Sequence, residues 1–312
     1  MKRIIALLTT LVFLFSFASC GVKVVDSKNR GALNVYLDGE SIGTITVDNL
    51  NKKSVESEFD GVTFSGNYVE KILKSADLSG VKAAFTKSTD GTAQYFADIS
   101  NLFVANCTVE DGKYISLADA QGKDCFGVAE GNTGAIGVTD IYLLTDAQDW
   151  KTEVTVNGTS KTITIADFMA MNPTYQTLKH KYDGGANEFE GDFLCVDSKT
   201  FWEYFGLPLT EGTNDNGLPV YYEEGMNIFF TGMVQSADTD LEEKINYDLK
   251  PNPLVDKTGW QVYYFILING NDYHDIISSD LGLSCIFNDT GVRWMTTPIT
   301  KVEVSPVPEV TE

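Results

Sequence analysis

The histidines of this chain are the residues that could serve as general bases or metal ligands. There are only two, His180 and His274, and the sequence has no Cys-x-x-Cys and no His-Glu-x-x-His spacing. The patterns that usually hold zinc are therefore missing. His180 lies between Lys179 and Lys181, where it is either an anion or substrate contact or part of a solvated loop. His274 lies between Tyr273 and Asp275 and is either a base tuned by carboxylates or a surface residue. We assign no catalytic and no metal-binding residue.

Cys20 is the thiol with the most informative surroundings. A basic start at Lys2 and Arg3 is followed by an apolar stretch over residues 4–17 and by two small residues, Ala18 and Ser19. This order is typical of a secretory signal, and the apolar stretch is shorter than a membrane-spanning helix. A cysteine directly after the small residues is typical of a bacterial lipoprotein signal, in which the thiol takes the lipid. The alternative is an ordinary signal peptide with an incidental cysteine. We expect a signal peptide over residues 1–20 and an extracytoplasmic protein anchored to a bacterial membrane through Cys20.

Four further cysteines remain, Cys107, Cys125, Cys195 and Cys285. An even number of cysteines in an exported protein permits disulfides. Partners within one domain meet more often than partners in different domains, so the pairs Cys107–Cys125 and Cys195–Cys285 are favoured if bonds form. The alternative is four buried thiols that act as small apolar residues.

The charge balance restricts the partners. The chain has 44 acidic against 23 basic residues, a net charge of −21, and no basic cluster. Nucleic acids and anionic lipid surfaces attract clustered Lys and Arg, so neither is an expected partner. Contact with the membrane is expected through the N-terminal lipid alone. An unidentified small molecule or surface protein remains as the partner.

The strands and helices that must position the candidate residues occur in two similar sets along the chain. Short segments rich in Val, Ile, Thr, Tyr and Phe alternate with Gly and Asn or Asp, which is typical of strands and turns. An Asp-Gly turn at Asp38-Gly39 and an Asn-Gly turn at Asn157-Gly158 each predict a β-hairpin. Residues 45–50 and 163–168 then match one another, as do Phe64-Ser65-Gly66 and Phe189-Glu190-Gly191.

Amphipathic stretches follow in both copies and predict helices over 68–78 and 198–207, the second capped by Asp197 or Ser198. Closing strands are predicted over 138–144 and 299–304. We expect an α+β, strand-rich fold, a tandem pair of mixed-sheet domains with a few short helices. The domains span 21–147 and 148–304, with the joint near 145–151, an insertion at about 210–260 in the second copy and a disordered tail over 305–312.

The order of these elements resembles the molybdopterin-binding domain of the sulfite oxidase family. In the first copy the resemblance rests on Phe64-Ser65-Gly66, Ser88-Thr89-Asp90-Gly91 and Thr139-Asp140-Ile141; in the second it rests on Phe189-Glu190-Gly191, Val292-Arg293-Trp294 and Ile299-Thr300-Lys301. That family usually has Trp where Phe64 and Phe189 stand. On the basis of this resemblance and of the polar cluster around His180, the candidate ligand-binding residues are His180, Lys181, Tyr182, Arg293 and Trp294.

The family holds molybdenum with a cysteine shortly before its Trp-x-Gly motif, and this chain has no cysteine in either corresponding region, 55–61 or 179–184. Molybdenum is soft enough to need thiolate. We therefore expect no cofactor, and a surface-tethered, non-enzymatic ligand-binding or interaction lipoprotein. The alternative is an exported oxidoreductase or electron carrier that binds molybdopterin or another planar cofactor through the second domain.

Overall fold

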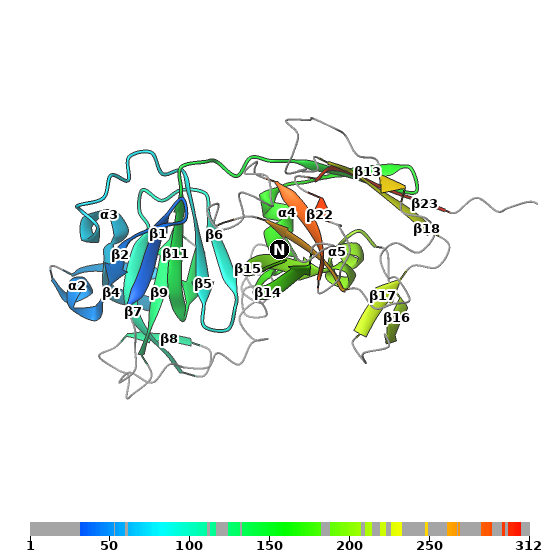
Figure 1. Cartoon of the computed structure of the whole chain (residues 1–312). Helices are drawn as coiled ribbons and strands as arrows, with labels where there is room; N and C mark the ends of the chain where they lie inside the picture. The colour runs from blue at the N-terminus through cyan, green and yellow to red at the C-terminus, as the bar shows by residue number, and fades with distance from the viewer. Residues whose placement is uncertain are drawn as a thin grey trace, which may run out of the picture. The chain divides into compact units, whose positions relative to one another are not determined.

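A computed structural model of the chain divides into two compact units, Met1–Asp146 and Ala147–Glu312. The division falls inside the stretch where the sequence placed the joint. The structure describes residues 32–52, 54–59, 62–110, 113–116, 124–131, 133–181, 188–206, 210–213, 219–222, 226–232, 247–248, 261–266, 268, 282–288, 295–296 and 299–306. Within these residues the fold is strand-rich with four short helices (Figure 1), which confirms the predicted α+β class.

The first unit consists of two sheets packed face to face. Its elements are β1 (Leu33–Leu37), β2 (Glu40–Ile45), α2 (Val47–Asn51), β3 (Val55–Phe59), β4 (Val62–Tyr68), α3 (Val69–Ile72), β5 (Ala83–Ser88), β6 (Ala93–Phe96), β7 (Phe103–Glu110), β8 (Lys113–Ser116), β9 (Asp124–Glu130), β10 (Thr133–Ile136) and β11 (Val138–Leu144). One sheet has the order β2-β1-β11-β5-β6 and the other β10-β9-β7-β4-β3, with β8 paired to β7.

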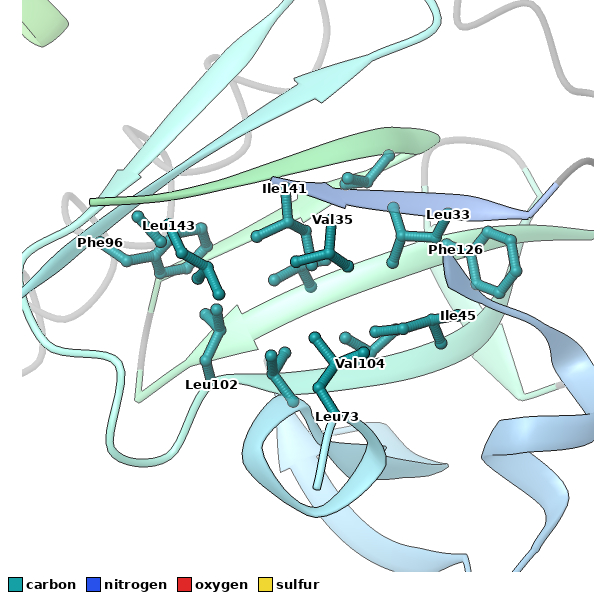
Figure 2. Close-up of a cluster of buried hydrophobic side chains, with 14 of the residues drawn as sticks. Leu33, Val35, Ile45, Leu73, Phe96, Leu102, Val104, Phe126, Ile141 and Leu143 are labelled. Carbon is teal, nitrogen blue, oxygen red and sulfur yellow. The ribbon is translucent and has the colours of Figure 1, made fainter. Parts of the chain in front are cut away.

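Buried side chains from both sheets of the first unit meet between them. Val35, Ile141 and Leu143 of the first sheet lie against Val104 and Phe126 of the second, as Figure 2 shows. All five are less than 5% exposed. Burial of apolar surface on this scale supplies the main stabilising free energy of such a unit.

The second unit has the same strand order as the first. Its elements are β12 (Thr152–Val156), β13 (Thr159–Ile163), α4 (Ile165–Ala170), β14 (Thr174–Lys181), β15 (Glu188–Asp197), α5 (Ser198–Tyr204), β16 (Thr210–Thr213), β17 (Pro219–Tyr222), β18 (Met226–Gly232), β19 (Tyr247–Asp248), β20 (Gln261–Ile266), β21 (Leu283–Asn288), β22 (Met295–Thr296) and β23 (Ile299–Pro306). The sheets β13-β12-β23-β18-β19 and β14-β15-β20-β21-β22 repeat the two orders of the first unit strand for strand. The predicted tandem pair is confirmed.

The first hairpin and the helix after it agree between the units in detail. Asp38 and Asn157 have φ of 46° and 49°, and each is followed by a glycine that also has positive φ, as a tight two-residue hairpin turn requires. Thr46 and Thr164 then form capping boxes with Asn49 and Asp167. This part of the sequence match was correct to the residue.

The match between the two Phe-x-Gly segments was wrong by four residues. Tyr68 and Asp197 are the N-caps of α3 and α5. Counting back from these equivalent positions pairs Phe64 with Phe193 and Gly66 with Cys195. The segment Phe189–Gly191 lies earlier in β15, which has ten residues where β4 has seven. The two Phe-x-Gly segments are alike in residue type only. The register of a strand is set by the strands with which it pairs.

Three predicted boundaries also need correction. α3 ends at Ile72 rather than near residue 78, and Asp77 instead accepts hydrogen bonds from the backbone N–H and hydroxyl of Ser79 in a turn. α5 begins after Asp197 as predicted but ends at Tyr204, and Gly206 follows with φ of 74°. β23 continues to Pro306, so the predicted tail began two residues too early, and residues 307–312 lie outside the described part.

Candidate functional site: an apolar pocket in the first unit

The second sheet of the first unit carries a hollow on the face turned away from the main core. Its edge strands approach one another there, because the ring of Phe59 from β3 lies against Gly134 of β10. A Cβ atom at Gly134 would lie only 2.5–3.0 Å from three carbons of that ring. The sheet is therefore strongly curved, and its concave face encloses a pocket.

The enclosed part of the pocket measures only about 20 Å³, and the surrounding space, which is open to solvent, brings the total to about 320 Å³. Three phenylalanines and a group of small residues line it, and Ser57 supplies the one polar side chain. Phe64 and Phe103 are almost fully buried, whereas Phe59 is half-buried. The complete lining is Ser57, Phe59, Phe64, Phe103, Ala105, Gly127, Val128, Ala129 and Ala135.

The strand register explains why Phe103, Ala105, Gly127 and Ala129 share one face, whereas Val128 and Ala135 belong to the face that packs in the main core. Tyr68 is opposite Phe103 and Gly66 is opposite Ala105 across β4 and β7, and Ala105 is in turn opposite Gly127 across β7 and β9. Side chains on directly opposed residues lie on the same side of a sheet. The ring of Phe103 also meets Tyr68 edge to face, with ring centres 5.4 Å apart, which fixes one wall.

Gly66 keeps the strands close beside this pocket. A Cβ atom there would lie 2.1 Å from the backbone oxygen of Val104 and 2.9 Å from the Phe103 ring. Only glycine allows so close an approach. The sequence pattern that marked Phe64 and Gly66 was therefore a signal of local packing.

The lining determines what the pocket can do. None of its nine residues titrates near neutral pH, so the pocket has no general acid or base and offers apolar contact with one hydroxyl. Such a site fits binding of an apolar group rather than catalysis. Sequence reasoning missed it. The usable signal was small residues on the same face of neighbouring strands, namely Ala105 in β7 and Gly127 and Ala129 at alternate positions of β9.

The predicted ligand-binding residues are only partly placed by the structure. His180 and Lys181 are the last two residues of β14, opposite Phe189 and Glu188 of β15. Tyr182, Arg293 and Trp294 lie outside the described residues, as does the signal segment with Cys20. The structure therefore does not show whether these residues meet. The described part of the chain contains no group of three or more His, Cys, Asp or Glu that could hold a metal.

Cys195 and Cys285 are buried, free thiols. They lie on β15 and β21, and β20 runs between these two strands, with Phe265 opposite Cys195 and Tyr264 opposite Cys285. The pairing Cys195–Cys285 is therefore wrong, because a disulfide needs neighbouring backbones. Burial raises the pKa of both thiols, and the nearby Asp197 adds to the effect at Cys195.

Cys107 and Cys125 are directly opposite one another across the antiparallel strands β7 and β9. Opposed residues in such a pair have Cα atoms about 4.5–5.5 Å apart, which is within the range that a disulfide spans. The pairing Cys107–Cys125 stays a prediction, and peptide mapping of the exported protein without reductant tests it.

Among the described residues, no helix combines the length and apolar character needed to cross a membrane. No family model, curated protein or solved structure matches the chain.

Proposed function

We propose that this chain is a lipid-tethered, extracytoplasmic binding protein whose first unit takes up an apolar group. The single observation that carries the proposal is the apolar pocket on the curved sheet of that unit. The signal-like segment before Cys20 supports the location, and the charge of −21 disfavours anionic partners. The alternative of a molybdopterin-dependent oxidoreductase stays a prediction that metal analysis of the natively produced protein tests.

The location is tested by substitution of the lipidated thiol. Cys20→Ser should abolish incorporation of labelled fatty acid and release the protein from the membrane fraction. Unchanged labelling would contradict the proposed anchor.

The binding function is tested with xenon on the lipid-free chain from Gly21 onward, which omits the signal segment and Cys20. Xenon enters accessible apolar cavities whatever ligand they serve. We expect saturable shifts of the backbone NMR signals of Ala105, Gly127 and Ala129. Ala105→Phe should remove these shifts by filling the pocket. Ala97→Phe, the same change at an exposed position just after β6, should leave them intact. Absence of a saturable shift in the unmodified chain would refute the proposal.

A further inference from the structure

The turn between β12 and β13 carries an asparagine followed by a glycine. Asn157 and Gly158 have φ of 49° and 79°, and both residues are exposed. A Cβ atom at Gly158 would have no neighbour within 4 Å, so the space beside the glycine is open. Because glycine has no side chain, its backbone nitrogen can approach the side-chain amide of the preceding asparagine with the least steric hindrance.

The two groups that would react in this turn are not held by hydrogen bonds. The backbone N–H of Asn157 donates to the Val304 oxygen at 2.9 Å, which anchors the start of the turn. Among the residues that the structure describes, no hydrogen bond involves the side-chain amide of Asn157 or the backbone N–H of Gly158. The nitrogen and the amide carbon that it would attack therefore have no competing partner there.

The first unit has the same turn, but its first side chain is held. Asp38 has φ of 46°, and its backbone N–H donates to the Leu143 oxygen at 2.9 Å, as that of Asn157 does to Val304. In addition, the Asp38 carboxylate accepts hydrogen bonds from the backbone N–H and the hydroxyl of Thr145, at 2.9 Å and 2.7 Å.

The last strand of the second unit lacks the donors that hold this side chain. Thr145 lies two positions after Leu143, and Pro306 lies two positions after Val304. Proline has no backbone N–H and no hydroxyl, so Pro306 can replace neither donor. The two units thus present one turn geometry with and without hydrogen bonds to its first side chain.

We infer that Asn157 is a site of spontaneous deamidation, and that the corresponding turn of the first unit is protected against the same reaction. The backbone nitrogen of Gly158 loses its proton and attacks the side-chain carbonyl carbon of Asn157. Ammonia leaves, and a succinimide ring joins the two residues. Water then opens the ring at either carbonyl group and gives aspartate or isoaspartate. The turn opens locally before the attack, and such opening costs least at exposed turns with few contacts.

The reaction changes the charge of the turn and, in one product, the length of the main chain. Both products carry a carboxylate in place of the amide, so the second unit gains a negative charge. Isoaspartate also adds a methylene group to the main chain between the Asn157 N–H and Gly158, which weakens the pairing of β12 with β13. The aspartate product copies the Asp-Gly sequence of the first unit without the two donors of Thr145.

Incubation of the folded, lipid-free chain from Gly21 onward in H₂¹⁸O at mildly alkaline pH tests the inference. Ring opening places ¹⁸O in the product, and digestion in ordinary water keeps later deamidation unlabelled. We expect mass spectrometry to find labelled product at residue 157, and Asn157→Gln should remove it. A synthetic peptide of residues 154–161 gives the rate without the fold. Absence of label at residue 157 over a time that converts the whole peptide would overturn the inference.

Asp38→Asn is the matched test of the protection, because it places the same Asn-Gly sequence in the first unit. Its side-chain oxygen can still accept hydrogen bonds from Thr145, which must break before the attack. We expect deamidation at residue 38 to be at least about tenfold slower than at residue 157 in the same sample. Equal rates at the two positions would overturn the protection.

Addition of Thr145→Pro to Asp38→Asn copies the second unit and should bring the two rates together. Circular dichroism shows whether this double variant has folded, and Thr145→Ala, which removes the hydroxyl alone, takes its place if it has not. The rate at residue 38 should then rise by a smaller factor. A rate at residue 38 that neither substitution raises would overturn the assignment of the protection to Thr145.

Discussion

Asp167 joins α4 to α5 in the second unit, and its replacement should destabilise that unit measurably. Its carboxylate accepts hydrogen bonds from the backbone N–H and hydroxyl of Thr164, at 3.0 Å and 2.9 Å, in the capping box of α4. Its other oxygen accepts a hydrogen bond of 2.7 Å from Tyr204 of α5 and lies 3.7 Å from the ammonium of Lys161. The same ammonium lies 3.8 Å from the centre of the Tyr204 ring.

The first unit contains a matched control, because Asn49 closes the same capping box with Thr46. Loss of a cap costs about 1 kcal/mol. The hydrogen bond from Tyr204 to a charged acceptor adds about 1.5 kcal/mol, the lower end of its range because the site is partly exposed. The exposed ion pair with Lys161 adds at most about 0.5 kcal/mol. We therefore expect Asp167→Ala to cost about 2–3 kcal/mol and Asn49→Ala about 1 kcal/mol.

Tryptophan fluorescence separates the two units in this experiment. All four tryptophans, at positions 150, 202, 260 and 294, belong to the second unit. Urea unfolding followed by their emission should shift to lower urea for Asp167→Ala. Asn49→Ala lies in the first unit, so it should leave the transition seen by tryptophan emission unchanged. Its effect should appear only in far-UV circular dichroism, which reports on both units. Asp167→Asn, which copies the first unit, should retain the cap and lose about 1 kcal/mol or less.

Acidity provides a second readout for the same carboxylate. Partial burial raises the pKa of Asp167, but hydrogen bonds from Tyr204 and Thr164 and the charge of Lys161 outweigh it, so the pKa is lowered overall. A carboxylate whose pKa is lowered by folding stabilises the fold at pH values above its pKa in the unfolded state, about 3.9. This contribution is lost as the pH falls through its pKa in the folded state. The difference between the native chain and Asp167→Asn should therefore shrink below about pH 4. Equal shifts for Asp167→Ala and Asn49→Ala, or a difference that grows in acid, would refute this reasoning.

Two further predictions concern packing and thiol chemistry. Gly66→Ala should destabilise the first unit by about 1–3 kcal/mol or more, because its Cβ atom would overlap the Val104 oxygen. Gly80→Ala, whose Cβ atom would have a nearest neighbour at 3.8 Å, should be close to neutral in the same thermal melt. Cys195 and Cys285 should resist iodoacetamide in the folded chain at pH 8, because burial raises the pKa of both thiols. Rapid alkylation without unfolding, measured by mass spectrometry, would contradict their burial.

The sequence predicted those features that depend on neighbouring residues. The turns at Asp38-Gly39 and Asn157-Gly158 and the helix starts at Thr46 and Thr164 have short-range causes, and each was found where expected. Because these segments occur twice in the sequence, they also predicted that the two units share one strand order. The Phe-x-Gly match failed because register is set by strands distant in the sequence.

The pocket could not be predicted for a related reason. It exists because the sheet curves until Phe59 of β3 reaches Gly134 of β10, and these residues are 75 positions apart in the chain. Ala105 and Gly127 read as ordinary small strand residues until their opposed positions are known. The curvature of a sheet depends on all its strands together, so no single segment of the sequence predicts this pocket.

The parallel pairing of the first and last strands has a mechanical consequence for each unit. β1 runs parallel to β11, and β12 runs parallel to β23. The chain therefore enters each unit at one end of this strand pair and leaves at the other. Tension applied between the two ends slides one strand along the other and loads all hydrogen bonds of the ladder at once, instead of opening them one by one. A protein fixed at its N-terminus and pulled from beyond its C-terminus would thus resist as two shear-loaded clamps in series.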